Sequence, residues 1–286
     1  SPSITFSNDT DTGLIRPSSG SIGFVSNSTQ IANIDDNGLT VSNKDATINS
    51  ITVGKGANSV AGNTVLGESA LDAAVTGGNN TAIGKNSLTA NTSGTKNSAL
   101  GEGTLQANTT GSHNTAMGYQ ALITNTEGDS NVSVGWKSLE LNTTGNSNVA
   151  IGRDVLGENT TANNNTGVGT NALATNTTGT QNVAVGSNAL DANTTGNFNT
   201  ALGFTALGAN TTGSQNTGLG RSALSLNTTA SNNSAFGYHA LLSNTTGSAC
   251  VAVGRDSLDA NTTGNHNTAV GNDTLGANTT GDQNVA

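Results

Sequence analysis

A pattern of seventeen residues repeats without insertion or deletion from Asn63 to the last residue of the chain. One copy, from Asn199 to Gln215, reads N-T-A-L-G-F-T-A-L-G-A-N-T-T-G-S-Q. A fixed period of this kind is typical of a repeat architecture, in which each unit buries its apolar side chains against its neighbours. The repeat therefore predicts an elongated array, and we number its positions one to seventeen from the first asparagine.

The composition of the chain narrows what such an array can do. Charged residues make up 9% and aromatic residues 3% of the 286 residues, and the formal net charge is −9. A nucleic-acid-binding surface needs basic patches, so this acidic balance argues against a nucleic-acid partner. No apolar run reaches the roughly eighteen residues that a membrane-spanning helix needs, so we expect no membrane insertion. Low hydrophobicity also occurs in disordered chains, but apolar residues at fixed positions in every repeat favour an ordered solenoid with a thin core.

The sequence pattern divides the chain into three parts. Residues 1–50 lie outside the repeat, and their β-prone runs S-I-T-F-S, S-I-G-F-V-S and Q-I-A-N-I alternate with turn sequences such as N-D-T-D-T-G and D-D-N-G. We expect a small β-rich module there. Residues 51–62 form a junction, and residues 63–286 hold thirteen full repeats and a truncated fourteenth. Since the chain starts without methionine and stops inside a repeat, we expect it to be a fragment of a longer protein.

Two columns of apolar residues supply the expected core. Position four is apolar in every repeat, and position nine is leucine in all thirteen full repeats. We expect position four to point inward from a short strand at positions one to five, which the glycine at position five ends. Burying each apolar side chain is worth roughly 1.5–3 kcal/mol. The predicted core leucines are Leu71, Leu88, Leu105, Leu122, Leu139, Leu156, Leu173, Leu190, Leu207, Leu224, Leu241, Leu258 and Leu275.

Asparagine recurs at positions one and twelve, where the side-chain amides of successive coils can form hydrogen-bonded ladders. Position one is asparagine in thirteen of fourteen occurrences, and Cys250 is the exception. The N-T-T-G stretch that starts at position twelve closes the coil, with its glycine at an expected positive φ. The N-T-T triplet also matches a glycosylation acceptor, but the turn explains it better. The predicted ladder at position one includes Asn114, Asn131, Asn148, Asn165, Asn182, Asn199 and Asn216.

Positions six to eleven, x-x-A-L-x-A, are compatible with one turn of helix or with a second short strand. Alanine at position eight and leucine at position nine are adjacent, which fits strand alternation poorly, so we favour a helical turn. The expected fold is all-β or mostly β, a repetitive parallel β-roll or β-solenoid with seventeen-residue coils and a short helical turn in each. At a spacing of ~4.8 Å per coil, thirteen coils would span about 60 Å.

Position three bears on assembly, because it holds small residues almost throughout. It lies on the strand face opposite position four, where a solvated face normally carries larger polar side chains. We therefore predict that the backbone of another subunit packs closely there; the alternative is that alanine is simply tolerated on an exposed face. The predicted subunit contacts are Ala116, Ala150, Ala184, Ala201, Ala235 and Ala252.

Position six is the variable column and carries every arginine of the array. Residues this varied are expected on an outer edge of the coil. Aromatic faces beside polar neighbours can hold a sugar ring, and the alternative is that these are isolated surface aromatics. The candidate ligand-facing aromatics in this column are Tyr119, Trp136, Phe204 and Tyr238.

Catalytic and metal chemistry find little support in the sequence. Acidic residues are scattered over variable positions, and His113 and His266 are nine repeats apart. The motifs H-E-x-x-H and C-x-x-C and the phosphate-binding loop are all absent from the sequence. We therefore expect no catalytic residue, no metal and no cofactor, and we do not expect an enzyme. A glycan-active solenoid and an ice-binding solenoid are further alternatives, although the flat T-x-T face of the latter is missing.

Several segments resemble known families. N-S-V-A-G-N-T-V-L-G, N-T-A-I-G and N-V-A-V-G resemble the head repeats of trimeric autotransporter adhesins, which are left-handed parallel β-rolls. Those repeats are typically shorter, and x-x-A-L-x-A-N-T-T-G is extra here. F-S-N-D-T-D-T-G-L-I-R-P and I-A-N-I-D-D-N-G-L-T-V resemble a module of bacteriophage tail fibres, which often precedes N-T-A-I-G repeats and a self-cleaving chaperone domain.

The combined resemblance implies a homotrimeric fibre on a virion surface, in the extracellular space. Its partners would be two further copies of the chain, other fibre or baseplate proteins, and a host surface glycan or protein. The implied function is structural: a tail-fibre shaft that projects a receptor-binding end for host attachment. A bacterial trimeric surface adhesin head is the alternative. No catalytic residue carries over from either family.

Overall fold

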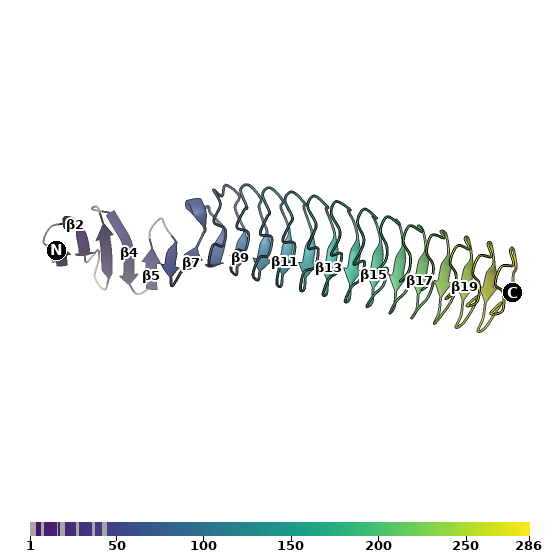
Figure 1. Ribbon diagram of the computed structural model, residues 1–286. Coiled ribbons are helices and arrows are strands. Elements are labelled where there is room, and N and C mark those ends of the chain that lie inside the picture. The colour runs from purple at the N-terminus through teal and green to yellow at the C-terminus, as the bar shows by residue number, and fades with distance from the viewer. Residues whose placement is uncertain are drawn as a thin grey trace.

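The computed structural model describes residues 4–6, 9–15, 17, 21–26, 29–35, 38–41 and 45–286, which form two β-sheets (Figure 1). The first is a five-stranded antiparallel sheet whose spatial order follows the chain. Its strands are β1 (Ile4–Phe6), β2 (Asp9–Ile15), β3 (Ile22–Ser26), β4 (Thr29–Asp35) and β5 (Gly38–Val41). The second sheet has fifteen strands, β6 to β20, also in chain order.

The first sheet contains more strand than the sequence predicts. The three expected β-prone runs form β1, β3 and β4, but β2 covers most of the N-D-T-D-T-G stretch that we expected as a turn. Both long edges of β2 have a partner, since it pairs with β1 and β3. The tertiary pairing therefore overrides the weak β-propensity of its aspartates and glycine. The second sheet begins before residue 50, because β6 (Ala46–Ile48) belongs to it.

A hairpin leads into the array. β6 pairs antiparallel with β7 (Ile51–Gly54), and β7 pairs antiparallel with β8. A short 3₁₀ helix, η1 (Ala57–Ser59), lies in the junction between β7 and β8. The first strand of the parallel stack is thus covered by the hairpin, which occupies an edge that would otherwise present unpaired backbone groups.

Thirteen parallel strands, one for each coil, make up the rest of the second sheet. Each residue pairs with the residue seventeen positions further on; Ala184, for example, lies opposite Ala201. The parallel β-solenoid with seventeen-residue coils is therefore confirmed, and Figure 1 shows the coils stacked side by side along one axis. The strands are β8 (Thr64–Gly67), β9 (Thr81–Ile83), β10 (Ser98–Leu100), β11 (Thr115–Met117), β12 (Val132–Val134), β13 (Val149–Ile151), β14 (Thr166–Val168), β15 (Val183–Val185), β16 (Thr200–Leu202), β17 (Thr217–Leu219), β18 (Ser234–Phe236), β19 (Val251–Val253) and β20 (Thr268–Val270).

The core is a thin column inside the coils. The leucines at position nine are completely buried from Leu71 to Leu258, and Leu275 in the last full coil is partly buried against the same cluster. In most coils the residues at positions three and eight are small, and Val155 beside Leu156 is an exception. Ala184 and Ala189, for example, belong to the same buried cluster as Leu190. One large apolar side chain per coil therefore fills the interior.

Position four points outward, opposite to our expectation. Leu202 is 49% exposed, whereas its neighbour Ala201 is 0% exposed. Adjacent side chains of a strand point to opposite faces, so an outward position four forces position three inward. The leucine at position nine already fills the narrow coil, which leaves room for little more than a methyl group opposite it.

The alanines of position three therefore cannot be subunit contacts. Each of the predicted contact residues is completely buried inside its own chain, so the prediction that they contact a neighbouring subunit is wrong. These residues are Ala116, Ala150, Ala184, Ala201, Ala235 and Ala252.

Positions six to eleven form turns, and residues 63–286 contain no helix. Positions seven and nine have positive φ in every full repeat; Asn188, for example, has φ 55° and Leu190 has φ 51°. Left-handed residues cannot continue a right-handed helix, so the expected helical turn is wrong. These two left-handed residues break the alternation of a strand and allow the adjacent Ala189 and Leu190 both to be buried.

Candidate functional site

The asparagines at position one form a continuous ladder inside the array. The backbone N–H of Asn199 donates to Oδ1 of Asn182 at 2.9 Å, and Nδ2 of Asn199 donates to the carbonyl of Gly213 at 2.8 Å. Each predicted ladder residue makes the same backbone contact and is completely buried. These residues are Asn114, Asn131, Asn148, Asn165, Asn182, Asn199 and Asn216.

A second ladder runs along position twelve. Nδ2 of Asn210 donates to Oδ1 of Asn193 and to the carbonyl of Gly213, each at 2.9 Å. Asn210 is completely buried, so its amide has no access to a glycosylating enzyme in the folded coil. The N-T-T triplet of this coil lies in the turn, as we expected, but Gly213 that follows it does not have a positive φ, so the expected left-handed glycine at position fifteen is wrong.

Cys250 interrupts the first ladder. Its backbone N–H still donates to Oδ1 of Asn233 at 2.9 Å, but the thiol replaces the amide oxygen that would accept the N–H of Asn267. Burial raises the pKa of the Cys250 thiol, while the N–H of Asn267 acts in the opposite direction. The thiol is therefore neutral at pH 7, and a neutral sulfur is a weak acceptor.

Replacing Cys250 by asparagine is expected to raise the free energy of unfolding by about 0.5–1.5 kcal/mol, because a full acceptor returns to the Asn267 N–H. Urea unfolding followed by circular dichroism measures the change. The matched control is Cys250→Ala, which removes the sulfur and supplies no acceptor, and should not stabilise the protein. Equal stability of the two variants would contradict the role we assign to the ladder.

The four candidate aromatics all lie on the surface, in the column of position six, but they form two separate groups. Tyr119 and Trp136 lie on adjacent coils and are both exposed. Nζ of Lys137 lies 5.2 Å from the centre of the Trp136 ring and pairs with Oε1 of Glu140 at 2.7 Å. This hydrogen bond with Glu140 is the main cause that raises the pKa of Lys137.

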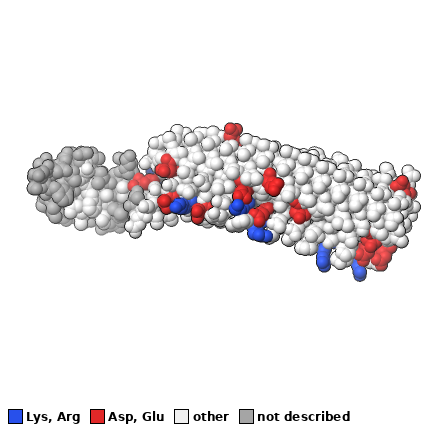
Figure 2. Space-filling view, in the orientation of Figure 1, with Lys and Arg blue, Asp and Glu red and all other residues white. Residues whose placement is uncertain are grey.

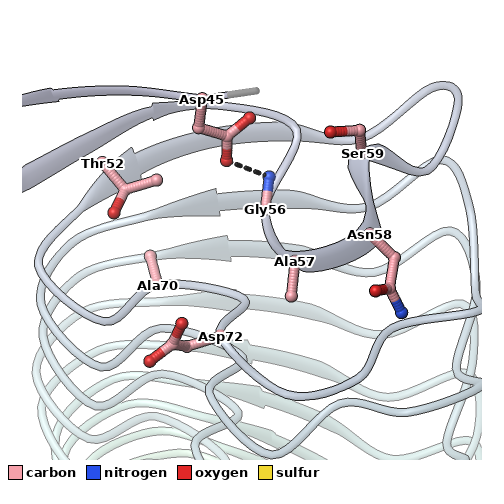
Figure 3. Close-up of a pocket in the computed structure, with 8 residues that line it drawn as sticks. All are labelled: Asp45, Thr52, Gly56, Ala57, Asn58, Ser59, Ala70 and Asp72. Atoms are coloured by element: carbon pink, nitrogen blue, oxygen red, sulfur yellow. Dashed lines mark hydrogen bonds between the residues drawn. The ribbon is translucent and has the colours of Figure 1, made fainter. Parts of the chain in front are cut away.

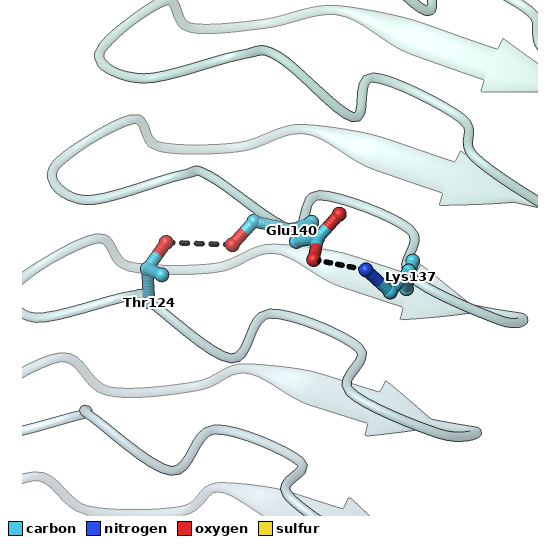
Figure 4. A network of polar contacts seen from close by, with 3 residues as sticks. All are labelled: Thr124, Lys137 and Glu140. Atoms are coloured by element: carbon cyan, nitrogen blue, oxygen red, sulfur yellow. Dashed lines mark hydrogen bonds and ion pairs between the residues drawn. The ribbon is translucent and has the colours of Figure 1, made fainter.

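Glu140 links this group to the neighbouring coil. Its backbone carbonyl accepts a hydrogen bond from Oγ1 of Thr124 at 2.6 Å, while its carboxylate holds Lys137 (Figure 4). The charge of the cation beside Trp136 is thus largely compensated by an acid of the same turn. The group is well suited to fastening adjacent coils, and it offers little net charge to a ligand.

Phe204 and Tyr238 form the second group together with Arg221 and Arg255, which were not among the predicted site residues. Cζ of Arg221 lies 5.9 Å from the centre of the Phe204 ring and 5.8 Å from that of Tyr238. Cζ of Arg255 lies 5.9 Å from the Tyr238 ring, and its Nε pairs with Oδ2 of Asp256 at 2.8 Å. The signal was present in the sequence, since all four residues occupy position six of consecutive repeats.

A cavity of about 440 Å³ lies at the junction, between the hairpin and the first coil (Figure 3). Asp45 and Asp72 contribute its two acidic side chains. The carboxylate of Asp45 accepts hydrogen bonds from the backbone N–H groups of Lys55 and Gly56, each at 2.6 Å. Asp45 thereby fixes the turn that joins the hairpin to the array, a role that the sequence did not reveal.

Charged side chains are sparse on the face drawn in Figure 2 and gather mainly along one edge of the array. In the part of the chain that the structure describes, no three His, Cys, Asp or Glu side chains are grouped so that they could hold a metal ion. Over the same residues, no helix is both long enough and apolar enough to cross a bilayer. Compared with known proteins, the chain matches no family model, no curated protein and no solved structure.

Proposed function

We propose that the array is the rigid shaft of a homotrimeric extracellular fibre, the tail fibre of a bacteriophage, which projects a receptor-binding end toward the host. The observation that carries the proposal is the unbroken stack of thirteen parallel strands, β8 to β20, in constant register. Two parts of the proposal, the location on a virion and the trimeric assembly, rest on the resemblance of the repeat and of the leading module to known families. The mechanical role follows from the way in which the coils are joined.

Every coil is bonded to the next at several places around its circumference. In the strand region, the N–H of Val183 donates to the carbonyl of Asn199 at 2.8 Å. At position nine, the N–H of Leu190 donates to the carbonyl of Ala206 at 3.1 Å. At the far turn, the N–H of Thr194 donates to the carbonyl of Thr211 at 2.9 Å. These hydrogen bonds repeat from coil to coil and so form rows along the array. Bending the array in any direction would stretch the hydrogen bonds of one row, so the array is suited to serve as a stiff spacer.

The apolar column of position four supports self-association. Its members face outward along the whole sheet, and eight of them are exposed: Leu66, Leu100, Met117, Ile151, Leu202, Phe236, Val253 and Val270. Isolated apolar residues on a surface need no explanation, but a contiguous apolar patch marks an interaction site. A strip about 60 Å long can approach the roughly 800 Å² per partner of a standard interface. We therefore assign the subunit interface to position four.

Wild-type protein is expected to sediment at three times the 28.2 kDa chain mass in analytical ultracentrifugation. Leu202→Glu should shift the equilibrium toward the monomer, because it places a charge in the proposed interface. Leu226→Glu is the matched control: Leu226 is as exposed as Leu202, at 49% each, but lies at position eleven, outside the sheet face. This control should leave the sedimentation coefficient unchanged.

A monomeric wild-type protein would overturn the assembly, and a dimer would overturn the trimer while keeping the interface. Equal dissociation of the two variants would show that the position-four column is not the specific contact. Circular dichroism of each variant separates a loss of assembly from a loss of fold.

A further inference from the structure

We propose that Phe204, Arg221, Tyr238 and Arg255, the arginine–aromatic column, bind a linear acidic polysaccharide that runs along the axis of the array. This inference goes beyond the proposed shaft function and does not depend on it. A shaft needs no ligand, and the column lies at position six, whereas the proposed subunit interface lies at position four.

The spacing of the column is set by the solenoid. Its four residues occupy consecutive coils, so they follow one another at ~4.8 Å along the axis. Aromatic and cationic side chains alternate, and residues of the same kind are therefore roughly 10 Å apart. This is about the length of one disaccharide in an extended sugar chain. A polymer with one neutral and one acidic sugar per disaccharide would place alternate sugars at rings and at arginines.

Arg221 is the anchor of the column. It lies between two rings, at 5.9 Å from Phe204 and 5.8 Å from Tyr238, and its side chain is exposed. Among the residues that the structure describes, no acidic side chain pairs with it. The rings restrict the guanidinium before any ligand arrives, which lowers the entropy lost on binding. Its planar fork of N–H donors matches a carboxylate in a bidentate arrangement.

The two rings supply the apolar part of the site. Phe204 is 49% exposed. Tyr238 is 38% exposed even though the His239 ring stacks on it with ring centroids 3.6 Å apart, so both rings keep area that the C–H face of a sugar can cover. Rigid aromatic side chains offer large contact area at low conformational cost. Because these rings alternate with the arginines, neutral sugars would stack on rings while acidic sugars pair with guanidinium groups.

The surroundings disfavour other anionic polymers. The chain carries a net charge of −9, so a nucleic acid would meet repulsion outside this short cationic stretch. Arg255 is already paired with Asp256 through Nε at 2.8 Å, so the local positive charge is modest. A polymer with an acid on every sugar would place negative charge against Asp256 as well. The column therefore favours a ligand of low charge density.

Isothermal titration calorimetry with hyaluronan octasaccharide tests the proposal, because a carboxylate-bearing sugar alternates with a neutral one in that probe. We expect measurable binding to the wild-type protein and at least about a tenfold loss of affinity in Arg221→Gln, the size of a lost charged hydrogen-bond pair. The double variant F204A/Y238A should also lose binding. Esterifying the carboxylates of the probe should abolish binding by the wild-type protein.

Arg153→Gln is the matched control, because Arg153 also occupies position six but has no described aromatic contact. It removes the same charge and should leave the affinity unchanged. The proposal is overturned if the wild-type protein does not bind the probe, if Arg153→Gln and Arg221→Gln weaken binding equally, or if the esterified probe binds as well as the acid. Sedimentation of each variant is measured alongside, so that a failure of the binding site is distinguished from a failure of the proposed assembly.

Discussion

Gly186→Ala is expected to destabilise the array by at least about 3 kcal/mol, because the added methyl group meets both a strained backbone and a neighbouring coil. Gly186 has φ 134°, a backbone conformation that side chains rarely adopt. A Cβ atom there would lie 2.5 Å from the carbonyl oxygen of Gly203 in the next coil, and that oxygen is backbone and cannot move aside. The glycine at position five is therefore required by the close approach of successive coils.

Urea unfolding and hydrogen exchange measure this effect, because a repeat array can open locally around a damaged coil. Gly208→Ala is the matched control. The nearest atom to a Cβ at Gly208 is 3.3 Å away, and position ten already carries alanine at Ala174. This control should be neutral or stabilising by up to about 1 kcal/mol. Similar losses in both variants would mean that the turn, and not the coil-to-coil contact, selects glycine.

Leu190→Ala is expected to cost about 2–5 kcal/mol, because it removes the one large apolar side chain of its coil and leaves a cavity. Leu190 is completely buried, and the alanines around it cannot extend into the space. The effect should also weaken the coils on either side, since position nine stacks directly on its equivalents above and below.

The midpoint and slope of urea unfolding report this loss of stability. Leu226→Ala is the control, because Leu226 lies on the surface and position eleven is alanine in many repeats, such as Ala209. It should change the free energy of unfolding by less than about 1 kcal/mol. A Leu190 variant as stable as this control would show that position nine does not support the core.

Periodicity predicted the architecture because a solenoid repeats its contacts as strictly as its residues. The leucine of position nine, such as Leu190, could be assigned to the core because no other large residue is invariant. Asn182 and its equivalents could be assigned to a ladder because stacked identical amides satisfy one another. Both assignments require only that the same residue type recurs at the same position of every coil. They do not require knowing the course of the backbone within a coil.

The direction of positions three and four could not be predicted, because it depends on the diameter of the coil. Hydrophobicity alone places Leu202 inside and Ala201 outside. The structure places them the other way, since Leu207 already fills the cross-section and only a small side chain fits opposite. The backbone conformation of Leu190 could not be predicted either. Leu190 has a left-handed backbone, which is unusual for leucine, and its residue type gives no sign of it.

The arginine–aromatic column could have been found from the sequence, but only with the solenoid register in hand. Phe204 and Arg221 are seventeen residues apart, and their proximity becomes visible once position six is known to form a straight outer row. Nothing in the local sequence around either residue indicates the contact. Asp45 is different, since its bonds to Lys55 and Gly56 depend on a turn outside the repeat.

The two asparagine ladders give the array a direction. At position one, Oδ1 of Asn182 accepts from Asn199 of the following coil, and at position twelve, Oδ1 of Asn193 accepts from Asn210 of the following coil. Both rows of amides therefore point the same way, with donors toward the start of the chain and acceptors toward its end. Two stacks of coils can extend these rows only head to tail, because a reversed stack would bring acceptor against acceptor or donor against donor.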